Sequence, residues 1–90
     1  MITLREACNI AQVDLETDNC FIRNNCKDLG DFWVFDWGWK DDPEALRVGI
    51  PMIKVEKNTG KIGYFDLGTP REENFKRFMK APYIDISEYI

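Results

Sequence analysis

The stretch Phe32-Trp33-Val34-Phe35-Asp36-Trp37-Gly38-Trp39 decides the fold, because aromatic and β-branched residues fill it almost without interruption. Such residues fit a pleated, half-buried surface, so the stretch predicts a strand over 32–39. Successive side chains of a strand point to opposite faces of the sheet. One face therefore carries Trp33, Phe35, Trp37 and Trp39, and the other carries Phe32, Val34, Asp36 and Gly38.

Three more strands are expected around this one, at 20–26, 50–56 and 61–67. Turns at 29–31 and 57–61 connect neighbouring strands, and Gly60 stands where a short hairpin loop needs a left-handed residue. Gly49 is expected to break the chain ahead of the third strand. Short turns favour antiparallel pairing, so we predict a four-stranded antiparallel sheet. The tail 83–90 alternates weakly and is interpreted either as an edge strand or as a segment packed on the body.

Two capping boxes predict a helix at each end of the chain. Thr3-x-x-Glu6 precedes apolar residues at helical spacing, and Thr69-Pro70-Arg71-Glu72 precedes the apolar stripe Phe75, Phe78 and Met79. Ala81-Pro82 is expected to end the second helix. The fold class predicted is therefore α+β, with an N-terminal and a C-terminal helix packed on one face of the sheet, in a single domain over 1–90.

Composition narrows the class of protein. Hydrophobic residues make up 44% of the 90-residue chain and charged residues 31%, which is typical of a globular domain. No apolar run is long enough for a membrane span, and the N-terminus lacks the layout of a signal peptide. The three cysteines, Cys8, Cys20 and Cys26, are an odd and widely spaced set, so buried, reduced thiols in the cytoplasm are expected.

The side chains that most catalysis requires are missing from the sequence. Histidine is absent, and neither a phosphate-binding glycine loop nor a closely spaced cysteine pair occurs. We therefore expect no enzyme activity, no metal site and no cofactor. The net charge of −4 and the pI near 4.7 also disfavour a nucleic-acid partner.

Charge is uneven along the chain. Nine acidic and three basic side chains lie between Gln12 and Glu44, whereas the rest of the chain carries seven acidic and nine basic ones. This imbalance predicts an acidic surface suited to a basic partner. The predicted contact residues are Asp36, Trp39, Asp41, Asp42 and Glu44, with the acids for steering and charge pairing and Trp39 as an apolar anchor.

Two of these residues have a second interpretation. Asp36 lies among aromatic residues, where it is either partly desolvated or simply on the solvent face of its strand. Trp39 stands at the strand end, where it is either a core residue or a partly exposed anchor.

The order of several short motifs resembles a known family. Trp33-Val34-Phe35-x-Trp37 is followed by an acidic Asp-Asp-Pro-Glu stretch, Gly49-x-Pro51, Lys57-Asn58-Thr59-Gly60-Lys61-Ile62 and Leu67-Gly68-Thr69. Over nearly its whole length the chain is similar to the YrhB-like domain, also described as the immunity protein 35 family. It differs from that family at Gly49-Ile50 and at Glu72-Glu73-Asn74-Phe75.

The resemblance implies an immunity protein, which binds and neutralises a cognate bacterial toxin delivered by contact-dependent or type VI secretion. The alternative that it implies is a small, heat-stable, chaperone-like protein that binds unfolded clients. A small enzyme ranks behind both. The oligomeric state stays open, because an exposed edge strand can pair with the same strand of a second copy or stay unpaired.

Overall fold

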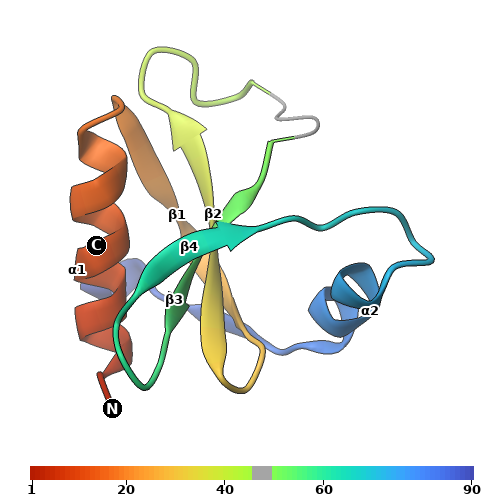
Figure 1. Ribbon diagram of the computed structural model, residues 1–90. Helices are drawn as coiled ribbons and strands as arrows, with labels where there is room; N and C mark the ends of the chain where they lie inside the picture. Colours follow the sequence, from red (N-terminus) through yellow and green to blue (C-terminus); the bar gives the residue numbers. More distant parts are fainter. Residues whose placement is uncertain (46–49) are drawn as a thin grey trace.

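Two helices and a five-stranded antiparallel sheet make up the part of the chain that the computed structural model describes, residues 1–45 and 50–90 (Figure 1). This confirms the predicted α+β class. Gly49, expected to break the chain, lies outside the described residues. In chain order the elements are α1 (Leu4–Glu16), β1 (Cys20–Asp28), β2 (Phe32–Trp39), β3 (Met52–Glu56), β4 (Ile62–Phe65), α2 (Glu73–Lys80), β5 (Tyr83–Asp85) and a 3-10 turn, η1 (Ser87–Tyr89).

The sheet has the order β4-β3-β2-β1-β5, with β2 at its centre. The prediction of four strands is wrong, because the tail forms a fifth strand that pairs with β1 through Asn25↔Asp85 and Lys27↔Tyr83. Three alternating residues give a weak sequence signal. In the fold they satisfy backbone groups along β1 that would otherwise form an open edge. The next residue, Ile86, is fully buried.

Helix α1 begins where the capping box predicts. The Thr3 hydroxyl accepts the Glu6 backbone N–H, and the Glu6 carboxylate accepts the Thr3 N–H. The helix then packs on the face of β2 that carries Trp33 and Phe35 (Figure 1). The helix residues buried there are Ala7, Cys8, Ala11 and Leu15, which lie at helical spacing.

Helix α2 lies on the opposite side of the sheet from α1, so the expectation that both helices cover one face is wrong (Figure 1). Its Phe78 ring stacks on Phe65 at 6.1 Å between ring centroids, and Phe65 meets Phe32 at 5.8 Å. The physical reason is that β2 is apolar on both faces. Phe32 and Val34 need a cover that α1 cannot provide.

The start of α2 also differs from the prediction. The Glu72 carboxylate accepts the Thr69 N–H, but the Thr69 side chain caps nothing, so only half of the predicted capping box forms. Residues 69–72 close a turn instead, in which the Glu72 N–H donates to the Thr69 carbonyl at 3.0 Å. The helix therefore starts at Glu73, and it ends before Ala81 as predicted.

The hairpin between β3 and β4 forms as expected. Gly60 has φ +73°, and the Glu56 N–H donates to the Lys61 carbonyl at 3.0 Å. The return strand is shorter than predicted, since pairing stops at Phe65. Within residues 1–45 and 50–90, no helix has the length and apolar character needed to cross a bilayer.

Candidate functional site

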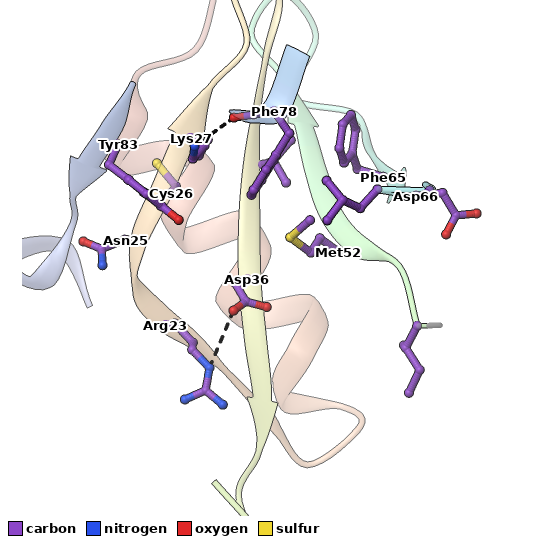
Figure 2. Close-up of a pocket in the computed structure, with 14 residues that line it drawn as sticks. Arg23, Asn25, Cys26, Lys27, Asp36, Met52, Phe65, Asp66, Phe78 and Tyr83 are labelled. Atoms are coloured by element: carbon purple, nitrogen blue, oxygen red, sulfur yellow. Dashed lines mark hydrogen bonds and ion pairs between the residues drawn. The ribbon is translucent and has the colours of Figure 1, made fainter. Parts of the chain in front are cut away.

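A groove lies on the face of the sheet that α1 leaves uncovered (Figure 2). Its volume of about 670 Å³ lies within the range of roughly 300–1,000 Å³ usual for ligand pockets. We call it the sheet groove. All five strands, α2 and the segments next to β3 and β4 contribute its lining residues, which are Arg23, Asn25, Cys26, Lys27, Val34, Asp36, Ile50, Met52, Phe65, Asp66, Leu67, Gly68, Phe78 and Tyr83.

An irregularity in β1 shapes the groove. Ile22 pairs with Trp37 and Cys26 pairs with Phe35, so β1 has extra residues opposite Asp36. Bulges of this kind redirect side chains and are common beside binding sites. Here the bulge contains Arg23, whose Nε lies 3.8 Å from Asp36 Oδ2 and whose Nη2 donates to the Pro43 carbonyl at 2.8 Å.

Gly38 makes room for this arginine. A Cβ at position 38 would lie 2.7 Å from Arg23 Nη2 and 3.0 Å from the Phe21 ring. The guanidinium also lies 5.2 Å from the centre of the Phe21 ring, a cation–π distance. Arg23 therefore lies across Gly38 and connects the sheet groove to the loop after β2.

At the α2 end of the groove, Lys27 is 4% exposed. Its Nζ donates to the Phe78 carbonyl at 2.8 Å and lies between the rings of Phe78 and Tyr83, at 4.6 and 4.3 Å from their centres. A cation near the last carbonyls of a helix is favoured by the helix dipole. Lys27 thus holds the C-terminal turn of α2 on the sheet.

The predicted contact residues separate into two places. Asp36 is on the groove face of β2, with its side chain 45% exposed, which matches the solvent-face interpretation. Trp39 is on the α1 face, partly buried against the core, with its ring 5.3 Å from that of Trp37 in an edge-to-face arrangement. Asp36 and Trp39 are therefore not brought together.

Asp41, Asp42 and Glu44 are all exposed in the loop after β2. The Asn19 side-chain amide donates to the Asp41 carboxylate, and the Lys40 N–H donates to the Asn19 carbonyl at 3.0 Å. Because Cys20 pairs with Trp39, this loop lies beside the end of α1. The acids of the loop, Asp41, Asp42 and Glu44, and the acids near the end of α1, Asp14, Glu16 and Asp18, therefore lie at the same end of the molecule, which we call the acidic end.

All three cysteines are buried and belong to the core beneath α1, and Cys26 also contributes to the lining of the groove. Burial raises the pKa of the Cys8 thiol to about 11 and that of Cys26 to about 12. Thiols with such pKa values are protonated near neutral pH and react slowly. In the described residues, no three His, Cys, Asp or Glu side chains come close enough to hold a metal ion.

The sequence prediction missed the cationic and aromatic parts of the groove, chiefly Arg23, Lys27 and Phe78. One signal was available, since the second face of β2 carries Phe32 and Val34 and so needs a cover of its own. The pairing of Arg23 with Pro43 had no local signal.

Comparison with protein-family models, with curated proteins and with solved structures finds no match for this chain. The resemblance to the YrhB-like domain therefore stays a prediction from the sequence motifs.

Proposed function

We propose that this protein works as an immunity protein, a non-catalytic inhibitor that binds a basic bacterial toxin domain in a tight complex. The observation that carries the proposal is the acidic end. Two acidic segments far apart in the sequence meet there, and Glu16, Asp18, Asp41, Asp42 and Glu44 are all exposed. An acidic surface of this kind accelerates association with a basic partner.

The position of these acids on α1 supports a binding role over a stabilising one. Asp14 and Glu16 lie in the last turn of the helix and Asp18 follows its C-cap, and the last turn has no basic residue. Acids there are repelled by the partial negative charge of the helix end, at a cost of about 0.3–1 kcal/mol each for surface positions. Selection for stability alone would disfavour them, whereas selection for a basic partner would keep them.

Within this proposal the two groups of contact residues have different roles. Asp41, Asp42 and Glu44 steer the partner by their charge. The backbone carbonyl of Trp39 accepts the Asp42 N–H at 3.2 Å and so fixes the start of the loop. The Trp39 side chain is only partly buried, and its exposed part supplies apolar contact with the partner. On the groove face, Asp36 lies beside Arg23 and supplies negative charge toward basic side chains of the partner.

The decisive experiment asks whether a gene next to the gene of this protein encodes a toxin domain, and coexpresses the two, scored by copurification and by rescue from toxicity. Association rates at low salt should fall at least about tenfold when Asp41→Asn, Asp42→Asn and Glu44→Gln are combined, with dissociation changed less. The matched control combines Glu56→Gln, Glu73→Gln and Glu88→Gln, which changes the net charge equally but leaves the acidic end intact. Absence of a complex, or equal effects of both variants, contradicts the proposal.

The open apolar groove favours one alternative function, chaperone-like binding of unfolded clients. That function predicts weak binding to many unfolded proteins and no single tight partner. Suppression of aggregation by the acidic-end variant and the wild type to the same extent, without any tight toxin complex, would support it.

A further inference from the structure

We infer that the sheet groove is the apolar anchor point of the proposed complex, where it takes an apolar side chain from a basic segment of the partner. A Lys or Arg beside that side chain then pairs with Asp66. This inference rests on the proposed function for the identity of the partner. The groove itself is defined by its own geometry (Figure 2).

Among the described residues, two basic and two acidic side chains line the groove, and they differ in exposure and in pairing. Lys27 is 4% exposed and is held between two aromatic rings, and the Arg23 guanidinium is bound to the Pro43 carbonyl beside Asp36. The Arg23 and Asp36 side chains are 36% and 45% exposed and form an ion pair with each other. Asp66 is exposed, and its carboxylate has no hydrogen bond or ion pair with any residue in 1–45 or 50–90. A basic side chain of the occupant is therefore complementary to Asp66.

The apolar part of the groove accounts for the anchor. Val34 and Phe65, at 1% and 3% exposure, lie at its base, and the less buried Met52 lies beside them. Ile50 is 40% exposed at its margin. Side chains that fill such pockets dominate the energetics of protein interfaces, while the charged surroundings contribute orientation and rate.

The groove and the acidic end are continuous. Arg23 lies beside Asp36 in the groove and donates to the carbonyl of Pro43, which lies between Asp42 and Glu44 in the acidic loop. A basic partner attracted to the acidic loop is thus brought directly to the groove. The acidic end should control association, and the groove should control dissociation.

Met52→Lys tests this division, because it places a positive charge where the occupant should be basic and apolar. With the toxin domain as ligand, we expect the dissociation rate to rise at least about tenfold and the association rate to change by less than about threefold. Met79→Lys is the matched control. It makes the same chemical change on α2 at a residue that is 60% exposed and does not line the groove, so both rates should stay within about twofold.

A second variant tests the same inference if Met52→Lys does not fold. Asp66→Asn removes an exposed carboxylate that holds no other residue, with Glu88→Gln as the control outside the groove. We expect faster dissociation for Asp66→Asn and wild-type kinetics for Glu88→Gln. Wild-type dissociation in both groove variants would overturn the inference, even with the toxin complex intact.

A peptide probe separates this inference from the proposed function. In ¹H–¹⁵N spectra, the acetylated and amidated peptide Lys-Leu-Lys-Leu-Lys should shift the amides of Val34, Asp36, Met52 and Phe65. The peptide with Glu in place of Lys should not. Shifts confined to the acidic loop, or equal shifts with both peptides, overturn the inference. Groove binding of the Lys peptide without any toxin complex would instead leave the groove site standing and remove the proposed function.

Discussion

The two faces of the sheet are built in different ways. The face beneath α1 is closed by a continuous core that runs from Ala7 on the helix through Phe35 and Val55 to Ile86 near the C-terminus. The opposite face has a small cluster, Phe32, Val34 and Phe65, and α2 covers it mainly through Phe78. No residue of α2 is buried.

This difference separates stability from binding. Burial of apolar surface is the main favourable term in folding, so the α1 face supplies most of the stabilising free energy. The α2 face leaves part of its apolar surface accessible, in a groove next to exposed carboxylates. Apolar surface that is left open beside polar groups is typical of interaction sites.

The largest expected effect compares equal truncations on the two faces. Phe35→Ala should lower the free energy of unfolding by about 3–5 kcal/mol, because Phe35 is fully buried in the core beneath α1. Phe78→Ala removes the same atoms from a half-buried position on α2, so the loss should be about 1–2 kcal/mol. Urea denaturation followed by tryptophan fluorescence measures both. Equal losses would show that the two faces stabilise the fold equally.

A smaller effect compares one ion pair from each side. On the α1 face, Lys57 Nζ donates to Asp28 Oδ1 at 2.7 Å, with side-chain exposures of 17% and 30%. Asp28→Asn should cost about 1–2 kcal/mol. Asp31→Asn removes the exposed partner of Arg77 in α2, where the separation is 3.4 Å, and should cost less than about 0.5 kcal/mol.

The pH dependence sharpens this second comparison. The hydrogen bond from Lys57 lowers the pKa of Asp28 below its ordinary value. A carboxyl with a lowered folded pKa adds stability above its unfolded pKa, near 4, and this stability is lost as the pH falls through the folded pKa. The stability difference between wild type and Asp28→Asn should therefore be constant above about pH 5 and shrink below about pH 4. A difference that does not change down to pH 2 would contradict the assigned pair.

The smallest effect concerns the thiols, which report how tightly the α1 face is closed. With Cys8, Cys20 and Cys26 buried there and the pKa values of Cys8 and Cys26 raised to about 11 and about 12, alkylation by iodoacetamide at pH 8 should be much slower in the native protein than in urea. Mass spectrometry over time measures it. Rapid modification of any one thiol in the native state would show that this face opens locally.

Local signals predicted much of the fold. Each of these signals acts within a few residues: the capping box at Thr3, the alternation over 32–39 and the left-handed Gly60. The residues that cause the helix start, the strand and the hairpin turn are therefore neighbours in the sequence. The fifth strand was left open between two interpretations of the tail, and the delayed start of α2 was missed, because each depends on distant contacts. β5 forms against β1, and α2 is held by Lys27 and Phe65.

The candidate site divides in the same way. The acids of the loop were visible in the sequence, and strand alternation already put Asp36 and Trp39 on opposite faces. The sequence did not indicate that this loop lies beside the end of α1, because that contact depends on the pairing of Cys20 with Trp39. The sheet groove was not visible either, since its lining comes from every strand and from α2.

By itself, the sequence determined the α+β class, the central strand, the N-terminal helix and the excess of acidic side chains, because propensity, alternation, capping and charge are properties of neighbouring residues. Only the tertiary structure decided which face each helix covers, that the tail completes the sheet, and that an arginine links a groove to an acidic loop. These features depend on side chains that are distant in the chain and meet only when the strands pair and the helices pack.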